Sequence, residues 1–96
     1  MNPVTYPNPY AGRGGIYVGF DLINPSIYIR FRLYTTGFRH IKTADLPQCY
    51  AGHNAVQVDD PFFRGLANGV YYYIVTEEDQ YGNMVRSKIS ELIVLK

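Results

Sequence analysis

Apolar and polar residues alternate along much of this chain with a period of two. Residues 16–22 carry apolar side chains at every second position, namely Ile16, Val18, Phe20 and Leu22. Residues 27–34 repeat the pattern, and we expect their inward face to consist of Ile27, Ile29, Phe31 and Leu33. Successive side chains of a strand point to opposite faces, so this spacing predicts two β-strands that each bury one face.

The middle of the chain predicts two further strands. Thr36 and Gly37 are typical of a hairpin turn, from which the chain would return as a strand over residues 38–46. A loop is expected over residues 47–52, because proline and glycine interrupt the pattern there. A short strand over residues 53–58 follows, again with alternate apolar positions.

The last third of the chain predicts a hairpin. Residues 70–79 begin with apolar side chains on both faces, as expected of a strand that is central in its sheet or covered on both sides. Residues 80–83 form a turn into a final strand over 84–96. The apolar positions of this strand change parity, which predicts a bulge or bend at Ser90 and Glu91. The alternative is a last strand that is apolar on both faces.

The first fifteen residues lack this alternation and are rich in proline and glycine. Proline has a fixed φ and no N–H to donate, so Pro7 and Pro9 exclude a central strand. We expect residues 1–15 to form an extended, polyproline-like lead-in segment that packs on a single domain of residues 16–96. Asn8 is expected to bond its own backbone in a turn. The alternative is a plain linker.

The order of these elements predicts the fold class. No helical pattern of useful length occurs, and about seven short strands are separated by turns every 8–12 residues or so. This pattern predicts an all-β fold, an antiparallel β-sandwich of the immunoglobulin or fibronectin type III kind. The Cys–Trp–Cys core of antibody domains is absent, since the chain has one cysteine and no tryptophan.

Composition and charge exclude several classes of function. The chain has 96 residues, of which 47% are hydrophobic, enough for one domain with a packed core. The formal net charge of +1 gives no electrostatic reason to bind nucleic acid or an anionic membrane. No apolar run approaches the roughly 20 residues that span a bilayer, so we expect no membrane insertion. No signal peptide is recognisable, so export would require a segment upstream of these residues.

Candidate catalytic and metal-binding residues are few. Cys49 is the only cysteine, which excludes an intrachain disulfide and a multi-cysteine zinc site. A nucleophilic Cys49 would need His40 or His53 as its base and a third orienting group. We favour a half-buried structural cysteine instead. The two histidines also form a possible metal pair, but a third ligand is not apparent.

Carboxylates and a glycine-rich loop offer two more possibilities. The candidate calcium ligands are the carboxylates of Asp59, Asp60, Glu77, Glu78 and Asp79. Their spacing is not that of an EF-hand loop, and solvated turn carboxylates are the interpretation we favour. Arg13-Gly14-Gly15 faintly resembles a phosphate-binding loop, but it leads into a strand and not a helix. We therefore expect no metal, no cofactor and no catalytic residue, and interpret the chain as a protein that is not an enzyme.

Tyrosine is the unusual feature of the composition. Ten tyrosines in 96 residues exceed what one small core can enclose, so some rings should be exposed, and tyrosine is enriched where proteins bind partners. Two adjacent phenylalanines in the loop over 59–69 suggest a second exposed patch. The candidate interaction residues are Tyr6, Tyr10, Tyr28, Tyr34, Phe62, Phe63, Tyr71 and Tyr73. The alternative for the strand tyrosines is that they form cross-strand pairs which cap a sheet.

Four segments taken in order resemble a known module. They are "YPNPY", "FRLYTTGFRHIK", "LANGVYYYIVT" and "SKISELIVLK". This order resembles the immunoglobulin-like module at the C-termini of many large bacterial secreted and surface proteins. The module is related to the immunoglobulin-like domain of flagellar hook-capping proteins, and is similar to the C-terminal sorting domains of the type IX secretion system.

The resemblance covers roughly residues 5–96 and rests on particular positions. Those that match the family pattern are residues 6–9, Leu33, Tyr34, Gly37, residues 68–71 and the basic Lys96. Two positions depart from it. Val58-Asp59-Asp60 stands where many flagellar-type members have Trp-Asp-Gly, and Phe62-Phe63 lies in a loop that is usually polar.

The resemblance implies a non-catalytic structural or interaction module of a secreted or cell-surface bacterial protein, used for docking, display or sorting for export. Its expected location is extracellular or at the cell surface. The expected partners are the preceding domain of the same polypeptide, the secretion or surface-assembly machinery, or copies of the chain itself. Two alternatives remain open: a self-assembling subunit of an extracellular filament or sheath, and a carbohydrate-binding module that uses exposed tyrosines.

Overall fold

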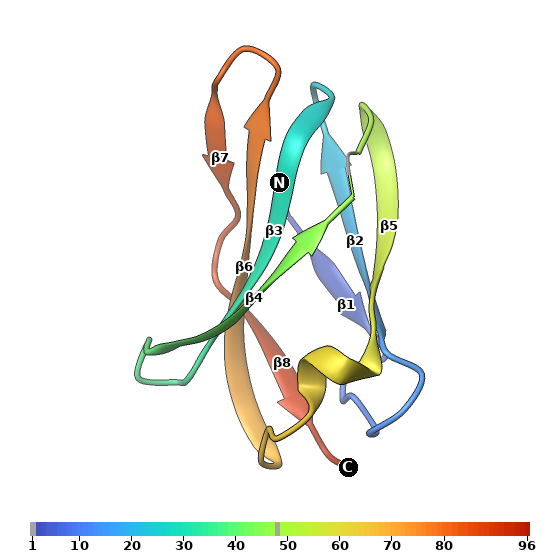
Figure 1. Ribbon diagram of the computed structural model, residues 1–96, viewed down its shortest axis with the longest axis vertical. Helices are drawn as coiled ribbons and strands as arrows, with labels where there is room; N and C mark the ends of the chain where they lie inside the picture. The colour runs from blue at the N-terminus through green and yellow to red at the C-terminus, as the bar shows by residue number, and fades with distance from the viewer. Residues whose placement is uncertain (1, 48) are drawn as a thin grey trace.

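Two antiparallel β-sheets pack face to face in the structure, a computed structural model that describes residues 2–47 and 49–96 (Figure 1). The elements in chain order are β1 (Val4–Tyr6), β2 (Ile16–Leu22), β3 (Ser26–Tyr34), β4 (His40–Leu46), β5 (Gly52–Val58), the 3-10 helix η1 (Asp60–Phe63), β6 (Gly69–Asp79), β7 (Met84–Arg86) and β8 (Ser90–Val94). One sheet has the order β1-β2-β5, and the other has β4-β3-β6, with β7 and β8 both paired to the far side of β6. The predicted all-β sandwich is confirmed.

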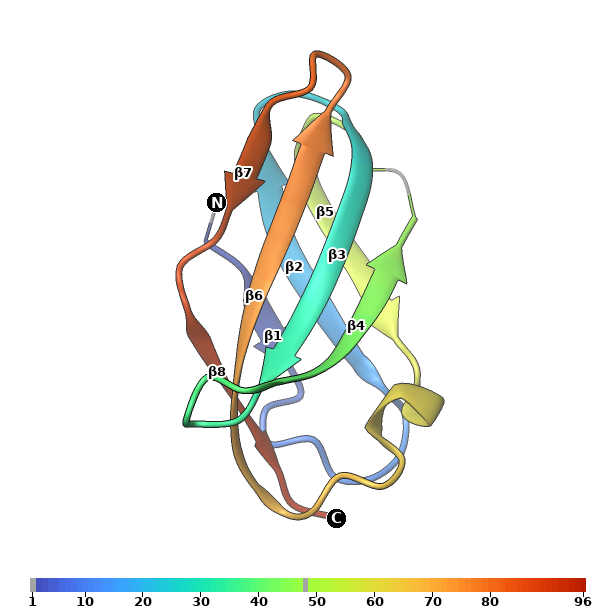
Figure 2. The same ribbon diagram turned by 60° about the vertical axis from the view of Figure 1, so that its left-hand side comes forward.

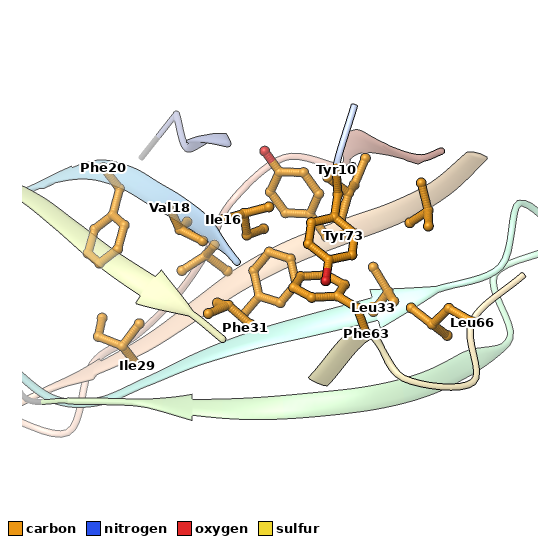
Figure 3. Close-up of a cluster of buried hydrophobic side chains, with 14 of the residues drawn as sticks. Tyr10, Ile16, Val18, Phe20, Ile29, Phe31, Leu33, Phe63, Leu66 and Tyr73 are labelled. Carbon is orange, nitrogen blue, oxygen red and sulfur yellow. The ribbon is translucent and has the colours of Figure 1, made fainter. Parts of the chain in front are cut away.

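The core lies between the sheets and follows the predicted alternation. All four apolar residues of 16–22 are buried, as are Ile29, Phe31 and Leu33 on β3. Figure 3 shows Ile16, Phe31 and Leu33 lying among aromatic rings from other segments. The ring centroids of Phe31 and Tyr73 lie 5.0 Å apart, and those of Tyr10 and Phe63 lie 4.3 Å apart. Aromatic pairs at this spacing add to the stabilisation that burial alone provides.

Strand β6 is the central strand of the larger sheet, as its apolar sequence predicts. It pairs with β3 over most of its length and, on its other side, with β8 and then β7 (Figure 2). Its odd-numbered side chains, such as Tyr73 and Val75, face the core, and its even-numbered ones face outward. Because β6 is paired along both edges, it is the strand that joins β3 and β4 to β7 and β8.

The expectation that Ile27 faces inward is wrong. Ile27 is exposed, and Ser26 takes the buried position, because the register of β3 against β6 shifts between Ser26 and Tyr28. The Ser26 hydroxyl accepts a hydrogen bond from the Cys49 backbone N–H, and the Cys49 carbonyl accepts one from the Ser26 N–H. The bulge therefore ties the start of β3 to the segment that leads into β5.

The parity change in the last strand is real but lies earlier than predicted. The break between β7 and β8 spans residues 87–89, with Lys88 and Ile89 outside the pairing to β6, and does not lie at Ser90-Glu91. Ser87 bridges the break: its N–H donates to the Val75 carbonyl, and its hydroxyl accepts from the Val75 N–H. The Ser87 hydroxyl thus takes the place of a backbone carbonyl, and both the N–H and the carbonyl of Val75 are hydrogen-bonded.

The proline-rich segment passes from one sheet to the other. Residues 4–6 form the edge strand β1 beside β2, and Tyr10 then pairs in parallel with Val94 of β8. Between them the chain bends at residues 7–9, so the segment is not polyproline-like there. The peptide bonds before Pro7 and Pro9 are cis. The Asn8 side chain does not bond its own backbone; it donates to the Glu91 carbonyl and accepts from the Ile93 N–H.

The glycine-rich loop that follows is held by the Asp60 carboxylate. This group accepts hydrogen bonds from the Tyr10 hydroxyl at 2.7 Å and from the backbone N–H groups of Gly15 at 2.7 Å and Gly14 at 3.1 Å. The Tyr10 hydroxyl is the main cause that holds the pKa of Asp60 below its ordinary value, and the Gly15 N–H adds to it. Burial is the main cause that raises the pKa of Tyr10 to about 12. The anion cradle suggested by Gly14-Gly15 therefore exists, and the chain's own carboxylate fills it.

Helix η1 closes the same end of the core. Phe63 is fully buried, and Phe62 packs against the core without being exposed. Two lysines satisfy the carbonyls at the end of the helix. Lys42 donates to the carbonyls of Phe62 and Arg64, and Lys96 donates to those of Phe63 and Leu66. The prediction that these two phenylalanines are exposed is therefore wrong, because the loop covers one end of the core and packs their rings against it.

Gly15 provides a test of how firmly the lead-in segment is packed. Its φ is +62°, and a Cβ added there would lie 2.5 Å from the Val58 carbonyl oxygen, whereas a Cβ at Gly14 (φ +87°) meets nothing within 4 Å. Both alanine variants carry the cost of positive φ, but only Gly15→Ala adds a clash with backbone. We expect Gly15→Ala to lower the free energy of unfolding by roughly 2 kcal/mol more than Gly14→Ala. Urea unfolding of both variants measures this, and equal losses would contradict the packing described.

Asp60 predicts acid sensitivity. Its pKa is lowered in the folded state, so its stabilisation is present above its ordinary pKa of 3.8 and is lost as the pH falls through the lower folded value. Asp60→Asn should reduce the urea midpoint at pH 7 and flatten its fall as the pH drops below about 4. Asp59→Asn is the matched control, since the Asp59 side chain makes no capping hydrogen bond. Identical pH profiles for the two variants would contradict the role of Asp60.

Candidate functional site

The outer face of the five-stranded sheet combines aromatic and cationic side chains. On β3 these are Tyr28, Arg30, Arg32 and Tyr34, none of them buried. Each lies opposite an outward residue of β6, with Tyr34 beside Tyr72 and Arg32 beside Ile74. Tyrosine and arginine both pack an apolar stem while keeping a polar tip in water, so the face is stable in solvent and suited to contact.

Two adjoining hollows lie on this face. The first, which we name the Arg32 hollow, has a volume of about 290 Å³ and is lined by Arg32, Thr76, Met84 and Val85 together with three shared residues. The second, the Phe38 hollow, has a volume of about 480 Å³ and is lined by Phe38, Tyr72, Ser87, Lys88 and Ile89 together with the same three. The shared residues are Tyr34, Ile74 and Arg86. We call the two hollows together the sheet groove.

One wall of the groove is the β3–β4 loop, which Figure 2 shows extending across the front of β6. Phe38 in this loop has φ +64° and is 59% exposed, and its ring stacks on that of Tyr72 with centroids 5.3 Å apart. The turn is closed by hydrogen bonds from the Phe38 N–H to the Thr35 carbonyl and from the Thr35 N–H to the Arg39 carbonyl. A bulky residue at positive φ is uncommon and concentrates at ligand-binding positions.

The other wall is the break between β7 and β8. Because Lys88 and Ile89 lie outside the pairing to β6, both are exposed, and both line the hollow that Phe38 also lines. Ile74, which is 9% exposed, forms the floor on β6. The groove therefore exists because of the parity change in the last strand.

The cations of the groove are not engaged within the protein. In residues 2–47 and 49–96 the ion pairs are Arg30 with Asp45 and His53 with Asp21. Arg32, Arg86 and Lys88 take part in neither, and no carboxylate of the described residues lines either hollow. Among the described residues, three cations and no carboxylate therefore line the groove, while Glu91, opposite Tyr72, and Glu78, opposite Met84, lie on the same face at its margins.

The eight tyrosines and phenylalanines predicted as an interaction surface do not form one surface in the structure. Tyr10, Phe63 and Tyr73 are buried in the core and cannot contact a partner, and Phe62 packs against the core. Tyr71 is partly buried, with its hydroxyl on the Ala67 carbonyl. The prediction of an exposed surface is wrong for the three buried rings.

The remaining three are not buried, but they lie on two different faces. Tyr6 stacks on Tyr17 at 5.7 Å, and the two pair across β1 and β2 on the outer face of the smaller sheet. Tyr28 and Tyr34 lie on the outer face of the larger sheet, where Tyr28 is 53% exposed beneath the Arg30 guanidinium. Among these candidates, only Tyr34 lines the groove.

The residues weighed for catalysis or metal binding are dispersed. His40 on β4 contacts Thr43, while His53 on β5 contacts Asp21. Burial raises the pKa of Cys49, its thiol donates to the Pro47 carbonyl, and such a thiol is poorly nucleophilic. Among the described residues, no three histidine, cysteine, aspartate or glutamate side chains are placed to hold a metal ion.

The acidic residues of β6 have structural surroundings. Asp79 accepts hydrogen bonds from the N–H groups of Tyr81 and Asn83 and so shapes the β6–β7 hairpin. Glu77 faces the core, 8% exposed, and its Oε2 has no hydrogen-bond partner within the described residues. Burial is the main cause that raises the pKa of Glu77, and the nearby Asp79 adds to it. The surroundings of Glu77 thus disfavour the charged form of its carboxyl group.

Several residues of the groove were not predicted from the sequence. Phe38, Tyr72, Ile74, Lys88 and Ile89 come from three separate segments, so no local pattern connects them. One signal was present: a phenylalanine directly after Thr36-Gly37 places a large apolar ring in a turn, where solvent exposure is expected.

Comparisons with family models, with curated proteins and with solved structures gave no match to this chain. The described residues contain no helix with the length and hydrophobicity needed to cross a bilayer. The family resemblance noted from the sequence therefore stays a prediction.

Glu77 predicts a stabilising substitution. Because its pKa is raised in the folded state, its contribution is favourable below the ordinary pKa of 4.5 and is lost as the pH rises through the folded value. Glu77→Gln should raise the free energy of unfolding at pH 7, because it removes a charge that burial disfavours while keeping the side-chain volume, and should have little effect at pH 4, where the carboxyl group is more fully protonated. Thermal unfolding at both pH values measures this. Glu78→Gln, on the outward face of β6, is the control, and an equal gain there would contradict the explanation.

Proposed function

We propose that this chain is a non-catalytic binding module that docks a partner in the sheet groove. The observation that carries the proposal is Phe38, a large ring held at positive φ and left 59% exposed over an apolar hollow. A chain that needed only a tight turn would place glycine or asparagine at this position, because both adopt this conformation at lower cost. A phenylalanine at this position therefore favours a use outside the fold.

A non-catalytic role is supported by the positions of the reactive side chains. Cys49 is buried, the two histidines lie on different strands beside separate partners, and Asp60 is occupied by hydrogen bonds from its own chain. General acid–base and nucleophilic catalysis require such groups to converge on one accessible point. The groove offers rings and cations in their place, which suits binding.

The setting follows from the family resemblance. A C-terminal immunoglobulin-like module of a secreted or cell-surface bacterial protein would use such a groove for docking, display or sorting for export. The partner would then be the preceding domain of the same polypeptide or a component of the secretion or surface-assembly machinery. An immunoblot of the source cells with an antibody to this segment tests the setting: a product much larger than 11 kDa supports a module within a longer chain.

Site-specific photocrosslinking tests the docking role. A benzoylphenylalanine at position 38 places the reactive group in the groove, and the same residue at Tyr17 places it on the outer face of the other sheet, 42% exposed. We expect a discrete crosslinked product in the source cells from position 38 and none from position 17. The crosslinker keeps an aromatic ring at both positions, so the two variants are closely matched.

The mass of the product distinguishes the possibilities. A product larger by the mass of another protein supports docking of a partner. A product of twice the mass of the chain would favour the self-assembling subunit instead. Equal crosslinking from both positions, or none from position 38, would contradict a groove that binds a partner.

A further inference from the structure

We propose that the sheet groove recognises an extended acidic peptide segment that inserts one large apolar side chain into the Phe38 hollow. This inference rests on the proposed function and gives its ligand a chemical class. It follows from three properties of the groove: an apolar hollow, unengaged cations beside it, and a break in the neighbouring strand.

The Phe38 hollow provides the apolar contact. Its volume of about 480 Å³ lies within the range of small-ligand sites. Phe38 and Ile89 stand on its two sides, 59% and 54% exposed, and Tyr72 and Ile74 lie beneath them. An aromatic or branched aliphatic side chain between Phe38 and Ile89 would remove both from water, which is favourable in proportion to the apolar area covered.

The cations give the sign of the ligand's charge. Arg86 belongs to both hollows, Lys88 lines the Phe38 hollow, and Arg32 lines the other. They contrast with Lys42 and Lys96, whose ammonium groups are used by backbone carbonyls around η1. In the described part of the chain the three groove cations have neither ion pairs nor side-chain hydrogen bonds. Carboxylates of the peptide, next to its inserted apolar side chain, could therefore accept hydrogen bonds from these cations.

The break between β7 and β8 favours a peptide over other anions. Ser87 is bonded to Val75, and its hydroxyl occupies the Lys88 carbonyl, but Lys88 and Ile89 lie outside the registers of both β7 and β8, so their remaining backbone groups are not part of a ladder. An extended peptide can use such backbone in addition to side-chain pockets. Nucleic acid would need cations spaced along a track to neutralise successive phosphates, whereas here they gather around one apolar hollow.

Calorimetric titration of the 96-residue chain with three synthetic peptides tests the proposal. The first has a central phenylalanine between three acidic residues on each side, the second replaces phenylalanine by alanine, and the third replaces the acidic residues by lysine. We expect only the first to bind measurably at low ionic strength, with affinity that falls as salt is added. Amide chemical shifts should change around Phe38, Lys88 and Ile89.

Two variants and two matched controls locate the binding. Lys88→Glu and Phe38→Asn should each weaken binding about fivefold or more, and asparagine at 38 still tolerates the positive φ of the turn. Arg13→Glu makes the same change of charge outside both hollows, and Tyr17→Asn removes an exposed ring from the other sheet; neither should change the affinity. Unfolding curves of all four show that the fold is intact.

Three results would overturn the inference: no binding of the acidic phenylalanine peptide at millimolar concentration, equal loss in the controls, or tighter binding of a sulfated oligosaccharide or a single-stranded oligonucleotide in the same groove. The photocrosslinking experiment separates this failure from that of the proposed function. If a partner crosslinks at position 38 while acidic peptides do not bind, the docking role stands and only the acidic class is wrong. If neither occurs, both are wrong.

Discussion

The Asp60 carboxylate is the contact on which the rest of this sandwich depends. It joins the 3-10 helix to two neighbouring parts of the chain that lie 45 to 50 positions earlier, namely Tyr10 after the proline-rich stretch and the glycine loop. Because it holds Tyr10 in the core, Tyr10 can pack on Phe63 and pair with the outer edge of β8. Hydrogen bonds to an ionised acceptor are stronger than neutral ones, so one side chain can order a loop that its composition would leave flexible.

Strand β6 connects this core to the groove. Its odd-numbered side chains fill the interior, while Tyr72 and Ile74, at even positions, form the base of the Phe38 hollow. The last strand must bury Ser87 and then Leu92 and Val94, positions of opposite parity, against the same sheet. It does so because Lys88 and Ile89 lie outside the ladder with β6, and these two residues form a wall of the groove. Core packing and the candidate binding surface therefore share one cause.

Much of the fold could be predicted from the sequence, and most of the site could not. The alternation of apolar and polar residues predicted β2, because successive side chains of a strand point to opposite faces. The apolar side chains on both faces of residues 70–75 predicted the central position of β6. The alternation failed at Ile27, where the hydrogen bonds between Ser26 and Cys49 outweigh the apolar pattern. The tyrosine count predicted exposed rings but not which ones: Tyr10 lies in an irregular segment without a period, and it is buried through Asp60, a residue fifty positions away. The groove depends on contacts between separate segments, such as Phe38 on Tyr72, which only the tertiary fold determines.

The two lysines that close η1 have a practical consequence for handling this protein. The chain has only three lysines, and the ammonium groups of Lys42 and Lys96 each hold two carbonyls. Lys88 is therefore the side-chain amine most open to acylation, and it stands on the wall of the groove. Random amine coupling to a sensor chip or a dye would modify the surface under study, and the buried Cys49 offers no alternative handle. Attachment is better directed to an engineered cysteine on the outer face of the smaller sheet, where neither the core nor the groove would be disturbed.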